Sequence, residues 1–277
     1  MNEKLPLVSV VVITKNEEKN IENCLKSVLN QTYPNDRIEI IVVDNNSTDR
    51  TKEIAEQYTA KVFNRGPERS AQRNFGAQQA QGRYYLYLDA DMALGDNVIR
   101  ECVKKFENRQ LVGLYIPEIV TGHGLWAKAR GFERSFYNAT AVDCVRCVFL
   151  KDFLAVNGFD ETMSGPEDWD FDKKIRAGGR VDIIKSAIYH NETNFNLKKY
   201  LTKKAYYAKS FRRYIAKWDK NDRDTKKQFG FYYRFIGVFI EQGKWKKLLR
   251  HPVLTVEMYF LRILVGFVFL IKTKLAN

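Results

Sequence analysis

Short apolar runs alternate with helical patterns in the first third of the chain. The run from Leu7 to Thr14 is almost continuously apolar, which is typical of a strand buried on both faces. In the helical patterns apolar residues recur three or four positions apart, as Ile21, Leu25 and Val28 do. The predicted strands cover residues 7–14, 37–45, 61–64 and 83–91, and the predicted helices between them cover residues 21–31, 47–58 and 70–81.

This alternation of strands and helices predicts an α/β fold with an open, mainly parallel sheet that carries helices on both faces. Ligands of such sheets bind outside the carboxyl ends of the strands. Polar residues follow three of the predicted strands, at residues 14–17, 44–46 and 89–91. We expect these segments to converge on one rim and to form a binding site there.

The chain then passes through a mixed region into a basic, apolar tail. Strand patterns cover residues 111–120, 142–150 and 181–190, and helical patterns cover residues 153–161 and 168–179. No internal repeat or low-complexity segment interrupts the sequence. We therefore expect a catalytic domain over residues 1–195 and a helical extension over residues 196–277.

The tail has the pattern of a membrane-surface segment. Residues 197–218 form a basic amphipathic pattern, with Leu201, Ile215 and Trp218 on its apolar side. Residues 253–271 are mainly apolar and carry two charges, Glu257 and Arg262, over a length at the margin of what can span a bilayer. A thin polar stripe along this helix favours a helix lying in the interface over one that spans the membrane.

The charge of the protein is concentrated in the same tail. The chain has a formal net charge of +13, and residues 198–277 hold 20 Lys and Arg against 5 Asp and Glu. Such a block binds anionic partners, either nucleic acid or acidic lipid. Because apolar and aromatic residues are interleaved with the charges, we expect a membrane surface with anionic lipids and no nucleic acid.

Asp89-Ala90-Asp91 carries the clearest chemical signal. Two carboxylates at the end of an apolar strand offer hard oxygen ligands for a divalent cation, either Mn²⁺ or Mg²⁺. The small Ala90 between them leaves room for a diphosphate to approach. A cation held there would neutralise the negative charge that develops on a leaving nucleoside diphosphate.

The chain resembles the family 2 glycosyltransferases, which have the GT-A fold and invert the anomeric centre. The matching segments follow one another in family order over residues 7 to 192: VSVVVITKNEEKNIENCLKSVLNQTY, IIVVDNNSTDRT, RSAQRNFGAQQAQGRYYLYLDADM, VNGFDE, GPEDWDFDKKIRAGG and AIYHNE. Many members have a Gly-Gly pair before Phe-Asp-Glu, whereas this chain has Asn157-Gly158. The shape of that loop is therefore less well defined by the resemblance.

The resemblance implies a nucleotide-sugar site along the strand ends. Asp44 would accept from the base, Arg73 would approach the base or the diphosphate, and Asp89 would contact the ribose. Asp91 would ligate the metal, with His190 near it and Asp89 as a further candidate ligand. The full set of residues implied in nucleotide-sugar binding is Thr14, Lys15, Asn16, Glu17, Asp44, Asn46, Arg73, Asp89, Ala90, Asp91 and Trp169.

Glu167-Asp168 matches the acidic pair of the family, in which the aspartate is the general base. Such a base must reach the acceptor hydroxyl from the side of the sugar opposite the leaving group. Asp170 and Asp172 are alternative bases, and the pair also suits the start of a helix. Trp169 would stack on a sugar or pack in the core. The acceptor is predicted to be lipid-linked or close to a membrane, and the segment at residues 122–137 to belong to its side.

Four cysteines, at positions 24, 102, 144 and 147, are too few and too scattered for a disulfide framework. Cys144 and Cys147 form one C-x-x-C pair without the partners of a zinc site, so we expect ordinary apolar residues there. The first residues lack the pattern of a secretory signal. We expect the protein on the cytoplasmic side of the cell membrane, peripheral or monotopic.

Three other functions fit the sequence less well than glycosyl transfer does. A sugar-phosphate nucleotidyltransferase would share the sheet and the cation, but it needs a glycine-rich loop where this chain has TKNEEKN. A dinucleotide-dependent oxidoreductase would need a G-x-G-x-x-G segment after an early strand. A basic nucleic-acid-binding protein could use the tail, but it would not need such long apolar runs.

Overall fold

The computed structural model describes the backbone of residues 5–274 and the side chains of residues 5–268. Within this range the chain forms two compact units, and each contains more than one stretch of sequence. The first comprises residues up to 118, 144–161 and 170–191; the second comprises residues 119–143, 162–169 and 192–277. The expected limits, 1–195 for the catalytic domain and 196–277 for the helical extension, divide the chain by function and stay a prediction.

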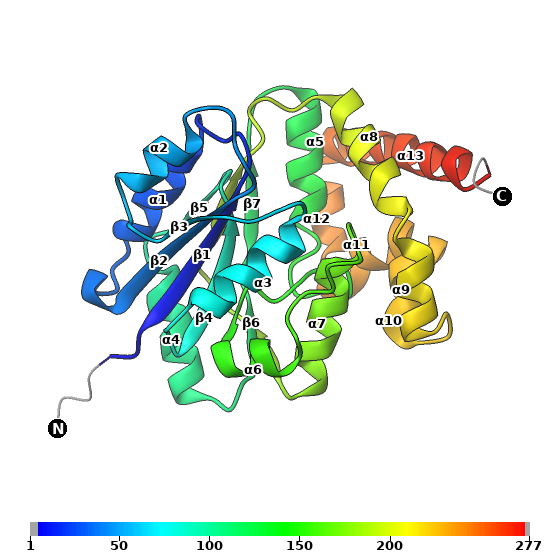
Figure 1. Cartoon of the computed structure of the whole chain (residues 1–277). Helices are drawn as coiled ribbons and strands as arrows, with labels where there is room; N and C mark the ends of the chain where they lie inside the picture. Colours follow the sequence, from blue (N-terminus) through cyan, green and yellow to red (C-terminus); the bar gives the residue numbers. More distant parts are fainter. Residues whose placement is uncertain (1–4, 275–277) are drawn as a thin grey trace. The chain divides into compact units, whose positions relative to one another are not determined.

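In the described part of the first unit, a seven-stranded sheet has the order β3-β2-β1-β4-β8-β6-β9 (Figure 1). β1 runs parallel to both β2 and β4, whereas β8 is antiparallel to β4 and β6. The predicted mainly parallel α/β sheet is therefore confirmed. The strands are β1 Val8–Thr14, β2 Ile38–Asp44, β3 Val62–Asn64, β4 Tyr84–Asp89, β6 Gly113–Tyr115, β8 Cys147–Phe149 and β9 Val181–Ile183.

Helices cover both faces of this sheet. Alternate residues of β1, such as Val10 and Val12, pack in a core with residues of α1 and α4. On the opposite face α3 approaches so closely that a Cβ at Gly76 would lie 2.4 Å from a methyl group of Val11, which explains the glycine. The helices are α1 Ile21–Leu29, α2 Thr51–Glu56, α3 Arg69–Gln79, α4 Val98–Asn108, α6 Leu150–Ala155 and α7 Glu167–Ala177, of which α7 begins in the second unit.

Three predicted strands are shorter or divided in the structure. The pattern at residues 111–120 divides into β6 and β7 (Glu118–Thr121) around Pro117, which lacks the N–H that a strand needs. The pattern at 181–190 divides into β9 and β10 (Ile188–Asn191), and β10 pairs antiparallel with β5 (Met92–Leu94). Of residues 142–150 only Cys147–Phe149 form a strand. All four cysteines are buried and form no disulfide with one another.

The second unit is mainly helical. The predicted helix at 197–218 is two helices, α8 (Leu197–Ala208) and α9 (Phe211–Trp218). α13 packs against α5 and α8. A core joins α5 and the residues after it to α13, the π-helical turn and α11, and consists of Phe132, Phe136, Tyr137, Tyr233, Val238, Phe239 and Met258. The remaining elements are α5 Leu125–Arg134, α10 Arg223–Phe229, the π-helical turn Tyr233–Gly237, α11 Val238–Ile240, the 3₁₀ turn Glu241–Gly243, α12 Trp245–Arg250 and α13 Pro252–Lys274.

The polar stripe of α13 faces the interior of the second unit. Arg262 is only 6% exposed, and the hydroxyls of Thr255 and Tyr259 donate to backbone carbonyls within the unit. Val256, at 71%, and Phe260, at 53%, are exposed instead. No helix among residues 5–274 is long and apolar enough to cross a membrane. The side chains of residues 269–271, at the end of the apolar stretch, lie outside the described ones.

Candidate active site

The carboxyl ends of the parallel strands meet at one rim of the first unit. The strand register places Thr14 opposite Asp44 and Ile13 opposite Asp89. Gln72 on α3 holds the rim together, because its amide donates to the carbonyls of Thr14 and Val43 at 3.0 and 2.7 Å. The sequence did not single out Gln72, although it lies beside Arg73 in the segment that carries the family resemblance.

The loops after β1 and β2 are bound to each other. Asn16 N–H donates to Ser47 Oγ at 2.7 Å, and Thr48 N–H donates to Asn16 Oδ1 at 2.8 Å. Asn16 and Asn46 have positive φ angles of 54° and 51°, a conformation that asparagine tolerates better than most residues. Asp44 is only 1% exposed and accepts from Ser47 N–H at 2.7 Å. The loops are thus held in a defined shape before any ligand binds.

Arg73 lies beneath the rim rather than on its surface. Its side chain is fully buried, and its guanidinium lies 4.7 Å from the ring centroid of Tyr87 and 4.9 Å from that of Phe159. Arg73 Nη2 donates to Asp89 Oδ1 at 2.9 Å. Burial would raise the pKa of Asp89, but the charges of Arg73, Arg69 and Arg146 outweigh it and hold that pKa well below its usual range.

Asp91 lies next to His190, as the sequence predicted for a metal site. His190 Nε2 is 3.2 Å from Asp91 Oδ2, and His190 Nδ1 is 2.9 Å from Glu118 Oε1. Burial would lower the pKa of His190, but the bonds to Asp91 and Glu118 prevail and raise it to about 10. Asp91 Oδ1 is buried and has no hydrogen-bond partner.

Glu118 is a functional candidate that the sequence reading missed. It is the first residue of β7 and only 6% exposed, and Arg146 Nη2 lies 3.4 Å from its second oxygen. Its position within an apolar strand pattern gave no sign that it would bind a histidine 72 positions away. A carboxylate on the outer nitrogen of a metal-ligating histidine is a recurrent arrangement, because it fixes the orientation of the ring.

The first turn of α7 carries the acidic pair and belongs to the second unit. Glu167 is only 1% exposed, whereas Asp168 and Trp169 are half-buried. The ring of Trp169 lies 6.2 Å from that of Phe211 and 5.8 Å from that of Phe229. Trp169 therefore packs within the unit, and the part of its surface that stays exposed could still meet a sugar.

The two alternative bases have structural partners in the first unit. Asp170 is fully buried and lies 3.4 Å from Lys174 Nζ. Asp172 is 3% exposed and accepts from Val145 N–H at 3.2 Å and from Arg176 Nε at 2.7 Å. Buried carboxylates engaged in this way are less accessible to an acceptor than Asp168 is.

The loop that departs from the family pattern has a defined shape. Asn157 and Gly158 both have positive φ angles, of 56° and 52°. The side chain of Asn74 binds the backbone of Phe159, the residue after Gly158. Its Oδ1 accepts from Phe159 N–H at 2.8 Å, and its Nδ2 donates to Phe159 O at 2.9 Å. Asn157 therefore takes the left-handed conformation that a glycine would adopt more easily.

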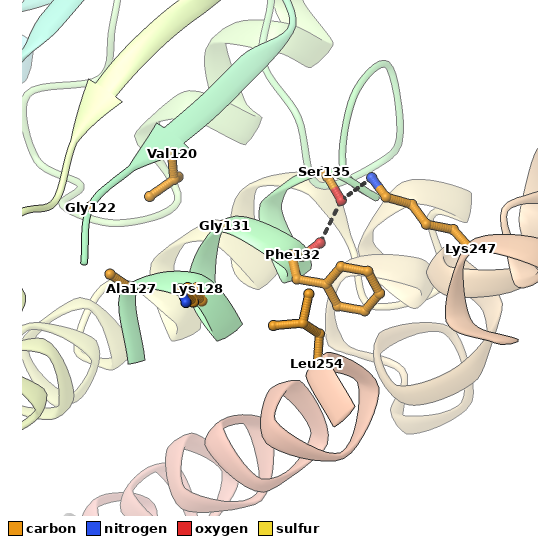
Figure 2. A pocket seen from close by; sticks show the side chains of 9 residues that line it. All are labelled: Val120, Gly122, Ala127, Lys128, Gly131, Phe132, Ser135, Lys247 and Leu254. Atoms are coloured by element: carbon orange, nitrogen blue, oxygen red, sulfur yellow. Dashed lines mark hydrogen bonds between the residues drawn. The ribbon is translucent and has the colours of Figure 1, made fainter. Parts of the chain in front are cut away.

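A cavity of about 270 Å³ lies in the second unit (Figure 2). Lys247 Nζ donates to Ser135 Oγ at 2.6 Å along its wall. None of the site residues predicted from the sequence lines this cavity. Its lining is Val120, Gly122, Ala127, Lys128, Gly131, Phe132, Ser135, Lys247 and Leu254.

Comparison with known proteins gives consistent matches. The family model described as Glycosyl transferase family 2 matches residues 9–151, more than half of the chain. Among curated proteins, the chain is similar to the glycosyltransferase AglE of Haloferax volcanii, with 41% identity over 98 residues that cover 33% of this chain and 32% of AglE. The chain spans at most about a third of the length of the first curated relatives it matches.

Two solved structures have the same fold. S. aureus TarS 1–349 in complex with UDP-GlcNAc matches with a TM-score of 0.58 at 20% identity, over 87% of this chain and 75% of that one. The mannosyltransferase PcManGT from Pyrobaculum calidifontis, in complex with GDP-Man and Mn²⁺, matches with a TM-score of 0.57 at 17% identity, over 95% and 74%. At these identities the likeness shows the fold alone. It confirms the predicted GT-A fold, and the family match shows that the chain belongs to glycosyl transferase family 2.

Proposed function

We propose that this chain is an inverting glycosyltransferase that moves a hexose from a UDP- or GDP-sugar to a lipid-linked or membrane-proximal acceptor. The observation that carries the proposal is the arrangement of Asp91, His190 and Glu118 at the rim where the parallel strands end. The solved structures of the same fold are complexes with UDP-GlcNAc and with GDP-Man, which supports a nucleotide sugar as donor.

The residues at the rim suit a divalent cation, either Mn²⁺ or Mg²⁺. Asp91 offers one buried oxygen without a partner and a second oxygen beside His190 Nε2. A cation bound to both side chains would replace the proton that they share, while Glu118 keeps the ring in place. Such a cation supplies a Lewis acid for the leaving diphosphate. Within residues 5–274 no three His, Cys, Asp or Glu side chains are grouped to hold a metal by themselves, and we propose oxygens of the donor diphosphate as further ligands.

The nucleotide would lie along the bound loops of the rim. Asp44 would recognise the base, with Thr14 to Glu17 and Asn46 beside it. Because Arg73 is buried beneath Asp89, its charge would reach the nucleotide through Asp89 rather than by a direct contact. Asp89 is then held ionised and in one orientation, ready to accept from a ribose hydroxyl.

Asp168 would act as general base toward the acceptor hydroxyl. It is more accessible than Asp170 and Asp172, and Glu167 and Trp169 are its neighbours in the first turn of α7. As Asp168 takes the hydroxyl proton, the acceptor oxygen would bond to carbon 1 of the sugar while the bond from carbon 1 to the diphosphate oxygen breaks and the nucleoside diphosphate leaves. One direct displacement inverts the anomeric centre.

The second unit would bind to an anionic membrane surface. An apolar stripe on α13 is exposed, at Val253, Val256, Phe260, Ile263 and Phe267. On α12, Trp245 and Leu249 are exposed beside the exposed Lys246 and Arg250. Exposed apolar and basic side chains on one short helix, as on α12, are typical of segments that lie in the membrane interface. We propose the cytoplasmic side of the cell membrane as the location.

Thermal unfolding with a panel of nucleotide sugars tests the donor half of this proposal. A UDP- or GDP-sugar should raise the melting temperature only when Mn²⁺ or Mg²⁺ is present, because a ligand stabilises the state that binds it. Asp91→Asn should remove the metal-dependent shift. Asp96→Asn, which changes an exposed aspartate outside the proposed site, should not. If no nucleotide sugar shifts the wild type, the proposed donor is wrong.

A further inference from the structure

Cationic side chains outnumber carboxylates in one cluster of the second unit. Arg262 Nη1 donates to Glu133 Oε1 at 2.5 Å, and Arg130 Nη1 lies 3.5 Å from Glu133 Oε2. Arg130 Nε also lies 3.9 Å from Glu192 Oε1. Both carboxylates of the cluster are therefore already engaged by these two arginines.

Two further cations of the cluster have aromatic neighbours instead of carboxylates. Lys204 Nζ on α8 lies 5.1 Å from the ring centroid of Tyr200 and 5.9 Å from that of Tyr207. The Arg234 guanidinium, in the π-helical turn, lies 5.7 Å from the ring of Tyr137 and 5.9 Å from that of Trp169. Among the described side chains, neither Lys204 nor Arg234 has a carboxylate oxygen within 4.0 Å.

These cations share one electrostatic environment. Burial and the charges of Arg130, Arg234 and Lys203 together lower the pKa of Lys204 to about 7, with burial the largest cause and Glu133 acting in the opposite direction. Arg130 faces the same Tyr200 ring as Lys204, at 5.9 Å. The side chains around Lys204 thus carry more positive charge than the nearby carboxylates neutralise. This excess disfavours the folded state unless an anion binds there.

The cluster is also linked to the segment that carries the proposed base. Arg234 lies against the ring of Trp169, the residue after Asp168. Just before α7, Gly165 packs on α8 so closely that a Cβ there would lie 2.4 Å from the Cβ of Tyr207. An anion held by Lys204 and Arg234 would therefore lie beside the part of the second unit that includes Asp168.

We propose that Arg130, Lys204 and Arg234 form a binding site for a phosphate group of the acceptor. The identification of this anion as part of the acceptor rests on the proposed glycosyl transfer. The three cations come from three different elements, and a phosphate, with three or four oxygens, can accept from all of them. Arginine and lysine together are a common phosphate-binding set, whereas a carboxylate has only two oxygens to share.

Binding of inorganic pyrophosphate to the full chain in the presence of EDTA tests the site without the metal or the donor. Lys204→Gln and Arg234→Gln should each raise the Kd about tenfold or more, since a hydrogen bond to a charged group is lost. Lys198→Gln and Arg223→Gln remove the same charges from exposed positions and should leave the Kd within about twofold. An equal loss of pyrophosphate affinity in the control variants, or no loss in the cluster variants, would overturn the proposed site.

Proton uptake by the wild type keeps the test independent of how the variants fold. Lys204, surrounded by Arg130, Arg234, Lys203 and Glu133, should be partly neutral above pH 7, and an anion beside it should raise its pKa. Calorimetric titration with pyrophosphate in two buffers of different ionisation enthalpy should show protons taken up above about pH 7. Proton release would overturn the site.

Vesicles separate an acceptor phosphate from a lipid headgroup. Arg234→Gln should bind vesicles of phosphatidylcholine, and of an equal mixture of phosphatidylcholine and phosphatidylglycerol, as the wild type does. If it loses binding only to the anionic vesicles, the cluster reads lipid headgroups and the acceptor assignment falls. The donor assay with nucleotide sugars is independent of this result, so a failure of the proposed function and a failure of this site are distinguishable.

Discussion

The Arg73 guanidinium donates to Asp89 Oδ1 at 2.9 Å, from a position where the arginine side chain is fully buried. The aspartate is held ionised by this pair and oriented toward the rim where the strands end. The sequence predicts that Arg73 approaches the nucleotide. In the structure Arg73 instead holds Asp89, another residue of the predicted site, in place.

Arg73→Met should lower the free energy of unfolding by about 3–5 kcal/mol, because it removes the buried arginine and leaves the half-buried Asp89 carboxylate without its partner. The double variant with Asp89→Asn should recover part of this loss, since the unpaired charge is then gone. Urea unfolding at neutral pH measures both values. Equal stability of the single and double variants would show that the pair is not the cause.

Glu118→Gln should weaken the binding of Mn²⁺ about 10- to 100-fold, because the amide no longer holds His190 as a carboxylate does. Calorimetric titration of the metal in the presence of excess nucleotide sugar measures the affinity directly. Glu101→Gln is a suitable control, since Glu101 bonds Ser186 and lies outside the proposed metal site. An unchanged Mn²⁺ affinity in Glu118→Gln would remove Glu118 from the site.

Asp168→Asn should reduce the rate of sugar transfer about 10²- to 10⁴-fold, the usual contribution of a general base. Its affinity for the nucleotide sugar should stay as in the wild type, because Asp168 acts on the acceptor. In this variant the transfer rate should therefore fall while the donor-induced shift in melting temperature stays unchanged. A variant that keeps most of its transfer activity would assign the base elsewhere.

The stability of the protein should depend on Glu133 in acid. Burial would raise the pKa of Glu133, but Arg262 and Arg130 lower it from 4.5 to about 2. The folded state therefore binds fewer protons than the unfolded state, and about 3 kcal/mol of stability is present above about pH 5 and lost as the pH falls to 2. Unfolding of Glu133→Gln and wild type at stepped pH values should show this difference, and parallel curves would contradict it.

The sequence predicted the parallel strands well because each is a local apolar run bounded by polar residues, as in Val8–Thr14. It located Asp91 and His190 through a family pattern. Glu118 and Gln72 escaped because their roles come from contacts with residues distant in the sequence. The role proposed for Lys204 escaped for the same reason. The helical spacing of the sequence places it on the charged side of an amphipathic helix.

The structure also changes how membrane attachment should be tested. A truncation after Trp218 would remove Met258 and Leu261, which are buried at 0% and 1% exposure, so it would damage the fold as well as any lipid contact. Val256→Ser combined with Phe260→Ser changes only exposed side chains of α13. This double variant should keep its melting temperature.

Its binding to anionic vesicles should weaken by several kcal/mol, since each apolar side chain contributes about 1.5–3 kcal/mol when it leaves water. Co-sedimentation with vesicles measures the partition. Thr202→Ser combined with Thr193→Ser alters hydroxyl residues elsewhere in the same unit and serves as the matched control. If the α13 variant partitions as the wild type does, the exposed stripe does not face lipid. The basic residues of α12 alone cannot account for insertion, because salt screens their attraction to anionic lipid.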